Sequence, residues 1–414
     1  MSAIDHREAA ARFQRQAPTA PGTLRFPEVQ RFVDEWRPAL EALALDVHQH
    51  PELAFQEHRT VKVLTDELAA LGFAVERPLA GLDTAFRAIR KFGSGGPRIA
   101  LLAEYDALPE LGHACGHNLI CTAAVGAAGA AAHVLEREGA NATIEVIGCP
   151  AEEGGGGKIL LLDAGVFESV DAAMMFHPSH RTMPVRGALA ATRLRFVWRG
   201  KAAHAATAPH QGINALDACI QTFNAINAMR QHFPDEHRVH GIIVHGGSAP
   251  NVVPDYAEAK FLVRHRHFAQ LGPLRDKVIR CAQGAALSVG AELEVEEGMI
   301  YAERRNNVPM AERFADYLVA QGVPLDPPPT SGGVGSSDFG NLSQAVPAIH
   351  AYVKIAPEGT SNHTPEFARA AASQDGMAGM IAAAKALAAT AVDLCLEPDL
   401  LRAATAAFHA DDPT

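Results

Sequence analysis

The order of elements in the middle of the chain constrains the fold most. Between residues 188 and 298, alternating and helical hydrophobic periods predict a strand, a helix, two strands, a helix and a final strand. The expected segments are Ala188–Trp198, Ile213–Gln231, Val239–His245, Ala257–His265, Leu271–Leu287 and Glu292–Glu296. This βαββαβ succession is the order of a ferredoxin-like unit.

The segments on both sides of this unit have a different character. Two helices are predicted within 27–71, and short strands at 84–90, 99–104 and 143–149 alternate with an apolar helix that starts near His117. Strands that alternate with helices predict an α/β domain with a parallel or mixed sheet. We therefore expect a discontinuous main α/β domain, residues 1–186 and 303–414, with residues 187–302 inserted into it.

Composition excludes several classes of function. The 414 residues are 48% hydrophobic and 20% charged, as in an ordinary globular protein. Acids and bases are interspersed at a net charge of -11, so we expect no nucleic acid partner. The start of the chain is polar and the most apolar run, 119–132, is too short to cross a bilayer, so we expect no secretion and no membrane. Six scattered cysteines indicate reduced thiols in a cytoplasmic protein.

Side chains that bind transition metals gather where predicted elements end. Cys115 and His117 lie between a predicted strand and the apolar helix, so both can point inward, and a helix N-terminus lowers the pKa of a thiol. A lone Cys or His is more often a core residue. His113, Cys115 and His117 alternate within five residues, however, and this pattern favours a metal site.

Glu152 and Glu153 follow directly on the predicted strand 143–149, at the end where open α/β sheets bind their ligands. One carboxylate can bind a metal while the other takes a proton from water, and the spacing alone does not say which does which. The glycines at 154–157 before Lys158 resemble a phosphate loop, but Ile159 stands where that loop needs Ser or Thr. We therefore disfavour a nucleotide-binding transferase.

Further polar candidates are single residues. His177 ends a short apolar strand predicted at 171–176, and His363 lies in a turn-rich loop. The inserted unit offers His204, Asn251 and Arg264, which suit an oxyanion or a carboxylate. Each of these is weak evidence alone, and the set of five candidate ligands, Cys115, His117, one of the two glutamates, His177 and His363, is stronger than its members.

Together these motifs resemble the M20 metallopeptidases, in particular their amidohydrolase branch. The resemblance covers about Leu45 to Phe367 and rests on motifs in a specific order. They are His48-Gln49-His50-Pro51-Glu52-Leu53, Asp106-Ala107-Leu108-Pro109, His113-Ala114-Cys115-Gly116-His117, Pro150-Ala151-Glu152-Glu153-Gly154, His177-Pro178, Gly200-Lys201-Ala202-Ala203-His204-Ala205, Asn251-Val252-Val253-Pro254 and His363-Thr364-Pro365-Glu366-Phe367.

The resemblance implies a role for each candidate. Its two-metal site would use Cys115, His117, Glu153, His177 and His363 as ligands. Glu152 would be the general base and later the proton donor, and Asp106 would orient a ligand from behind. The inserted unit would be a lid and dimerisation domain in which His204 stabilises the oxyanion, in its own site or a neighbouring subunit's. Asn251 and Arg264 would hold the substrate carboxylate.

Two departures point to a sub-branch. Many members have Arg-x-Asp-Met-Asp before Ala-Leu-Pro, whereas this chain has Ala103-Glu104-Tyr105-Asp106, and Asn118 replaces an acid after Cys-Gly-His. Both variants resemble aminobenzoyl-glutamate hydrolases and dipeptidases that release a basic residue.

We therefore expect a cytoplasmic homodimeric amidohydrolase that cleaves the amide before a C-terminal free amino acid in small acyl or dipeptide substrates. Its two divalent ions would be zinc, manganese, cobalt or nickel. The alternative is a non-catalytic or regulatory subunit of a paired amidohydrolase.

Overall fold

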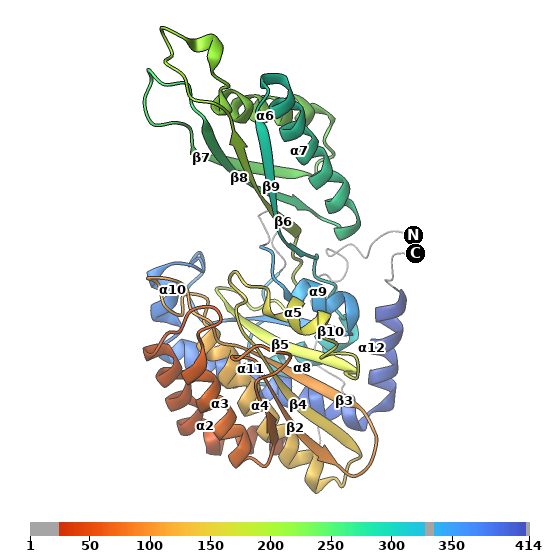
Figure 1. Ribbon diagram of the computed structural model, residues 1–414. Helices are drawn as coiled ribbons and strands as arrows, with labels where there is room; N and C mark the ends of the chain where they lie inside the picture. Colours follow the sequence, from red (N-terminus) through yellow and green to blue (C-terminus); the bar gives the residue numbers. More distant parts are fainter. Residues whose placement is uncertain (1–24, 328–334, 411–414) are drawn as a thin grey trace. The chain divides into compact units, whose positions relative to one another are not determined.

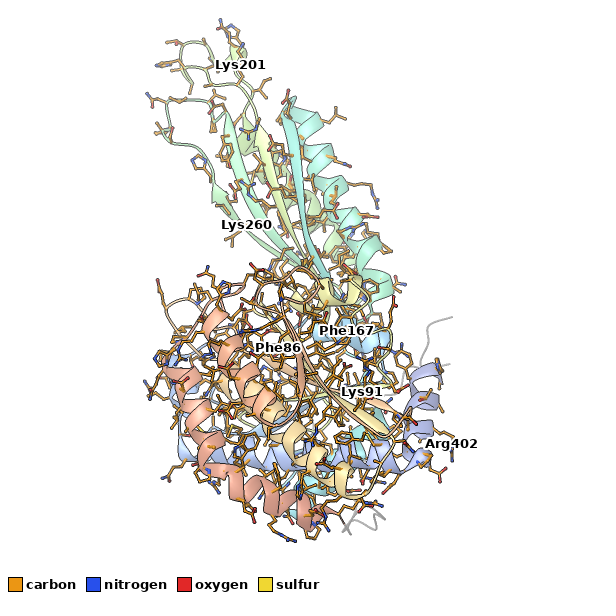
Figure 2. The ribbon with its side chains drawn as sticks, turned by 60° about the horizontal axis from the view of Figure 1, so that its bottom comes forward. Phe86, Lys91, Phe167, Lys201, Lys260 and Arg402 are labelled. Carbon is orange, nitrogen blue, oxygen red and sulfur yellow. The ribbon has the colours of Figure 1, made fainter. Side chains whose placement is uncertain are left out.

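The computed structural model describes residues 25–327 and 335–410, which divide into two compact units (Figure 1). Among the described residues, the first unit comprises 25–187, 305–327 and 337–410, and the second comprises 188–304 with 335–336. In Figure 2, the buried Phe86 and Phe167 lie in the first unit, and Lys201 and Lys260 lie in the second.

A six-stranded mixed sheet forms the centre of the first unit, in the order β1-β2-β4-β3-β5-β10. Its strands are β1 (Ala74–Glu76), β2 (Phe86–Phe92), β3 (Arg98–Glu104), β4 (Ala142–Cys149), β5 (Ala172–Ser179) and β10 (Ala348–Lys354). The four strands β4, β3, β5 and β10 run parallel, β2 pairs antiparallel with β4, and β1 pairs antiparallel with β2. The predicted mixed α/β sheet is therefore confirmed. The strand predicted to stop at Phe176 instead continues through His177 to Ser179, because it pairs with β10 along that whole length.

Two apolar helices, α4 (His117–Arg137) and α11 (Gln374–Leu396), pack against each other and against this sheet. Both are long and apolar enough to cross a membrane, but 94% and 83% of their apolar windows are buried inside the protein. The remaining helices are α2 (Phe26–Gln49), α3 (His58–Ala70), α5 (Gly157–Asp163), α8 (Val308–Ala320), α9 (Phe339–Ala345), α10 (Pro365–Ala370) and α12 (Pro398–Ala410). The helices α2 and α3 both contact α4. The apolar character of α4 and α11 is therefore that of core helices.

The second unit has an antiparallel four-stranded sheet in the order β7-β8-β6-β9. Its elements follow the chain as β6 (Ala190–Arg199), η2 (Pro209–Gln211), α6 (Ala215–Met229), η3 (Arg230–His232), β7 (Arg238–His245), β8 (Tyr256–His265), α7 (Phe268–Val289) and β9 (Glu292–Tyr301). Its core contains Trp198, Phe196 and Phe261 from the sheet and Leu274 from α7. The helices α6 and α7 pack against this sheet. Its edge strands β7 and β9 each have one neighbouring strand among the described residues.

Candidate metal centre

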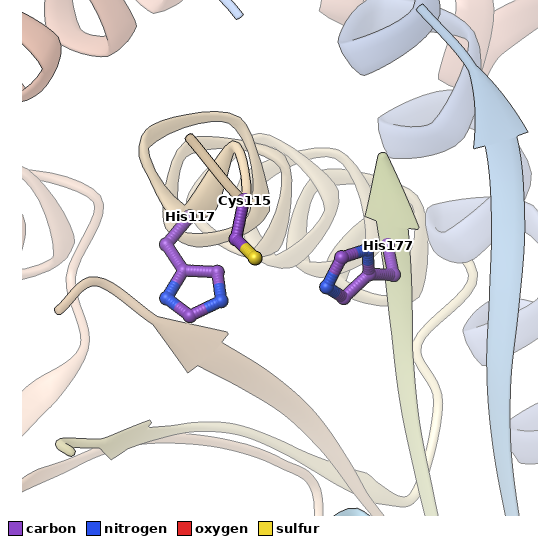
Figure 3. A group of neighbouring side chains, drawn as sticks. All are labelled: Cys115, His117 and His177. Carbon is purple, nitrogen blue, oxygen red and sulfur yellow. The ribbon is translucent and has the colours of Figure 1, made fainter. Parts of the chain in front are cut away.

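Cys115 and His117 lie at the start of α4, and His177 lies near the end of β5 (Figure 3). Gly116 separates the first two and caps the helix at a φ of 73°. A Cβ at Gly116 would lie 2.8 Å from Cγ of Pro178, so a larger residue would push the helix away from β5. Glycine at this position thus allows the thiol and both imidazoles to point toward one another, as Figure 3 shows.

All six candidates from the first unit meet at one place. Three overlapping groups each have their ligand atoms within 4.8 Å of one another: Cys115 with His117 and His177, Cys115 with Glu153 and His363, and His117 with Glu152 and Glu153. Cys115, His117 and Glu153 each belong to two of the groups, so two neighbouring cations could share ligands here. Thiolate, imidazole and carboxylate are the donors that transition metals prefer.

The acid pair and His363 are held by unusual backbone. Ala151, directly before Glu152, has a φ of 58°, and His363 has a φ of 62°. Residues with side chains rarely adopt this left-handed region, and such strain often occurs at functional sites. The N–H of His363 donates to the carbonyl oxygen of Ala114 at 3.0 Å, and its Nε2 lies 3.3 Å from Oε2 of Glu153. These contacts place the loop that carries His363 beside Cys115 and Glu153.

Asp106 orients two of the candidates at once. Nδ1 of His117 contacts the Asp106 carbonyl oxygen at 2.8 Å and its Oδ1 at 3.1 Å, while Oδ2 accepts from the N–H of Glu153 at 3.0 Å. Within residues 25–327 and 335–410, Nε2 of His117 and Oε1 of Glu153 are buried without a hydrogen-bond partner. These two atoms lie 3.8 Å apart. Two buried, unpartnered ligand atoms facing each other are what a bound cation would satisfy.

The charges of the site shift its pKa values. Burial and the nearby carboxylates of Glu104 and Glu153 raise the pKa of Glu152 well above its ordinary value. Although burial opposes it, the hydrogen bond from His363 lowers the pKa of Glu153 to about 2. Burial and the charge of Glu153 raise the pKa of the Cys115 thiol well above its ordinary value. The expected lowering by the helix N-terminus is therefore outweighed, and a bound cation would favour the thiolate.

The candidates of the second unit lie at two ends of it. His204 forms a β-bridge with Val252, and the N–H of Ala205 donates to the carbonyl oxygen of Asn251 at 3.0 Å, so His204 and Asn251 are neighbours. Both are exposed. Arg264 lies near the opposite end of β8, where it donates to Oγ of Ser336 at 3.0 Å. The structure does not bring Arg264 together with His204 and Asn251 within one chain.

Comparison with known proteins decides the family. Residues 100–387 match the model of peptidase family M20/M25/M40. The chain belongs to this family. The M20 family is metal-dependent, so the protein is a metal-dependent hydrolase.

Among curated proteins, this M20 chain is 38% identical to the Xaa-Arg dipeptidase of Mus musculus, over 93% of the chain and 94% of that protein. It is 30% identical to one of the p-aminobenzoyl-glutamate hydrolase subunits of Escherichia coli, over 91% of the chain and 94% of that protein. A dinuclear metal-binding M20 peptidase of Bacillus subtilis has the same fold, with a TM-score of 0.67 at 23% identity over 88% and 99% of the two chains. The sub-branch indicated by the departures at Glu104 and Asn118 is confirmed.

Sequence reasoning missed a buried ionic cluster behind Glu152. Nζ of Lys158 lies 2.5 Å from Glu104 and 2.6 Å from Asp338, and these two carboxylates form a further close group with Glu152. Lys158, Glu104 and Asp338 have no exposed surface. In the sequence, Lys158 suggests only a phosphate loop, and Glu104 is only a departure from a motif. A charged residue at the end of an apolar strand was the available signal.

Proposed function

We propose that this M20 hydrolase cleaves the amide bond between an acyl or aminoacyl group and a C-terminal free amino acid. Dipeptides that end in a basic residue and aminobenzoyl-glutamate-like amides are the first candidates, since relatives of 38% and 30% identity carry those names. The observation that carries the proposal is the set of three overlapping ligand groups that Cys115, His117, Glu152, Glu153, His177 and His363 form.

In this proposal, five side chains hold two divalent ions: Cys115, His117, Glu153, His177 and His363. The donors suit zinc, manganese, cobalt or nickel. When bound, the ions lower the pKa of a water molecule and polarise the substrate carbonyl.

Glu152 moves the proton. Glu153 is held by His363 and, through its backbone, by Asp106, whereas the Glu152 carboxylate lies with those of Glu104 and Asp338 beside the ligands. Bound cations beside Glu152 would favour its ionised form, and the Glu152 carboxylate would therefore take the proton from the attacking water and deliver it to the nitrogen of the leaving amino acid. Asp106 keeps the His117 ring in place through Nδ1 during both transfers.

His204 is suited to donate a hydrogen bond to the substrate. Its Nδ1 accepts from the N–H groups of Ala206 and Thr207, both at 3.2 Å, so a neutral ring carries its proton on Nε2. That N–H would stabilise the carbonyl oxygen as it becomes negative. Asn251, beside His204, and Arg264 would hold the substrate carboxylate.

We further propose that residues 187–302 form a ferredoxin-like lid and dimerisation domain of the discontinuous catalytic domain formed by 1–186 and 303–414. In the register of β6 and β8, Arg264 faces Ala191 and Tyr256 faces Arg199, so Arg264 and the loop with His204 and Asn251 lie at opposite ends of the sheet. The distance from Tyr256 to Arg264 is roughly 26 Å along the strand. One substrate cannot contact both ends, which favours a homodimer whose site takes His204 from the partner.

An exposed strand edge supports the same assembly. At β7, Ile242 is 64% exposed, Ile243 45% and Val244 44%, and the strand pairs only with β8 among the described residues. Apolar edges that face solvent tend to pair with another chain. We propose that two copies join here, in the cytoplasm, where the six free cysteines would stay reduced.

A substrate screen tests the function. The purified chain is loaded with Zn²⁺, Mn²⁺, Co²⁺ or Ni²⁺ and assayed against N-acyl amino acids, aminobenzoyl-glutamate and dipeptides with basic, acidic or neutral C-terminal residues. We expect release of the C-terminal amino acid with at least one metal and loss of turnover on chelation. Turnover only after addition of a second, different chain would overturn the proposal in favour of a subunit role. The motive for this alternative is that two different p-aminobenzoyl-glutamate hydrolase subunits of Escherichia coli are among the relatives.

A further inference from the structure

The segment after the His48–Leu53 motif contains a buried carboxylate with no role in the proposed chemistry. Glu57 directly precedes α3, has no exposed surface, and its Oε1 accepts a hydrogen bond from the N–H of Ala151 at 2.9 Å. The two residues are 94 positions apart in the chain. This buried acid also interacts with the side chain of Thr84, but its bond to the backbone N–H immediately before Glu152 and Glu153 calls for an explanation.

The bond holds a backbone conformation that the chain resists. At a φ of 58°, Ala151 lies in the left-handed region, where its Cβ crowds the backbone. This conformation turns the chain after β4, and the N–H of Gly155 closes the turn on the carbonyl oxygen of Ala151 at 2.9 Å. Without an external hydrogen bond, the backbone here could relax to an ordinary conformation, and Glu152 would then point elsewhere.

Carboxylates therefore hold the N–H groups of the residues before and after Glu152. Glu57 accepts from the N–H of Ala151, and Asp106 accepts from the N–H of Glu153 at 3.0 Å. We propose that Glu57 is a positioning residue that, together with Asp106, fixes the direction in which Glu152 and Glu153 leave the strand β4. The inference rests on the proposed function only for the identity of Glu152 as the proton-transfer group.

The loop that carries Glu57 is itself built against the turn. The N–H of Ala107, next to Asp106, donates to the carbonyl oxygen of Glu52 at 2.8 Å. A Cβ added to Gly155 would lie 2.4 Å from the Phe55 ring, so this ring packs directly on the turn. The two anchors thus belong to one assembly of three segments, around residues 51–57, 104–107 and 150–156.

A hydrogen-bond role makes a specific demand on the side chain. Burial raises the pKa of Glu57 to about 7, but a carboxyl oxygen accepts a hydrogen bond in either protonation state. Glu57→Gln keeps an oxygen that can accept from Ala151, whereas Glu57→Ala removes the acceptor. If Glu57 acts through this bond, Glu57→Gln will keep the position of the turn and Glu57→Ala will not.

A matched control is available at the same helix. Glu52 accepts from the N–H groups of Arg59 at 2.9 Å and Thr60 at 2.8 Å in the first turn of α3, whereas the N–H of Ala151 donates to Glu57. Glu52→Ala therefore removes hydrogen bonds from the same helix start without releasing the acid pair. Comparison of Glu52→Ala with Glu57→Ala therefore separates the effect of losing hydrogen bonds at the start of α3 from the effect of releasing the turn before Glu152.

The experiment compares Glu57→Ala, Glu57→Gln and Glu52→Ala as full-length, metal-loaded proteins, by kcat, KM, metal content, thermal unfolding and the visible spectrum with Co²⁺. Displacement of a catalytic group by about 1 Å costs about 100-fold in rate. We expect Glu57→Ala to lower kcat by about that factor with KM and metal content little changed, and to shift the Co²⁺ spectrum because Glu153 moves. Glu57→Gln and Glu52→Ala should keep the wild-type kcat and spectrum.

A second variant tests the strained turn directly. Ala151→Gly removes the Cβ that opposes the left-handed conformation, so the turn needs less support. In the double variant with Glu57→Ala, kcat should recover part of the loss. No recovery would overturn the idea that Glu57 acts by holding Ala151.

Three further results would contradict the proposed role of Glu57. The proposal is wrong if Glu57→Ala keeps its kcat, if Glu57→Gln falls as far as Glu57→Ala, or if Glu52→Ala loses kcat equally for an equal loss of thermal stability. If the wild-type protein hydrolyses none of the amides, the proposed function fails instead. The Co²⁺ spectra of Glu57→Ala and Glu52→Ala then still test whether Glu57 positions the Glu153 ligand.

Discussion

The candidate functional residues of the two units lie in contrasting surroundings. In the first unit, the candidate ligands lie at the ends of buried strands and at the start of the core helix α4, and Asp106, Glu57 and Lys158 support the site from behind. In the second unit, His204 and Asn251 are exposed on loops beyond the sheet, held by backbone hydrogen bonds. The candidate site of the first unit is largely buried and held by charged neighbours, whereas the candidate residues His204 and Asn251 of the second unit are exposed to solvent.

This difference predicts that substitutions in the two units affect different properties of the protein. A change in the first unit should alter chemistry, metal content or folding, because buried charges depend on one another. A change in the second unit should alter turnover or assembly with little effect on folding, because its candidate residues are exposed.

Glu152→Gln should have the largest effect. The amide cannot accept the proton, so we expect kcat to fall by about 10⁴-fold with metal content near that of the wild type. Glu153→Gln is the matched variant, since Glu153 is the proposed ligand and its loss should lower metal content measured by elemental analysis. Equal metal loss in both variants would show that Glu152 and Glu153 do not have the separate roles of base and ligand.

Lys158→Met tests how far the buried charges depend on each other. It would leave Glu104 and Asp338 buried beside Glu152 without their cation, so we expect a loss of about 3–5 kcal/mol in the free energy of unfolding. Lys385→Met is the control, because Lys385 makes an ion pair of the same 2.6 Å with Asp34, whose side chain is 53% exposed. Chemical denaturation of both variants compares them, and equal losses would show that burial of the cluster adds nothing.

His204→Ala should affect turnover only. Removal of a donor to the developing oxyanion costs about 10²–10³-fold in kcat, and the exposed position predicts an unchanged melting temperature. His210→Ala, at an exposed histidine of η2 in the same unit, should leave kcat unchanged. A mixture of His204→Ala and Glu152→Gln chains should regain activity if His204 acts in the partner's site. No regain, in a mixture shown to contain mixed dimers, would place His204 in its own chain's site.

The two units also differed in how well the sequence predicted them. In the first unit, Cys115, His117 and the glutamate pair were identifiable because each follows or begins a strongly patterned element. The partners that position them were not, because the cluster of Lys158 and Asp338 joins residues 180 positions apart and Glu57 acts on a turn whose strain leaves no mark in the sequence. In the second unit, the sequence predicted the order of the elements and the bounds of β6, β7 and β8 closely, but it ended the last strand at Glu296, whereas β9 continues to Tyr301. No local pattern places Arg264 and His204 at opposite ends of a sheet. That relation comes from the register of β6 with β8.

Ile243→Lys should have the smallest effect on folding and the most selective effect on assembly. Ile243 is exposed on the edge strand β7, so a charge there should change the free energy of unfolding by no more than about 0.5 kcal/mol. The same charge should oppose pairing of β7 with a second copy, because lysine on an edge strand disfavours such contacts. We expect light scattering to report a monomer, and activity to fall with it if His204 serves the partner. Leu287→Lys is the control, since Leu287 is 84% exposed on α7, away from the edge. If the Ile243→Lys variant is still a dimer, the interface lies elsewhere on the protein. If it is an active monomer, His204 acts in the site of its own chain.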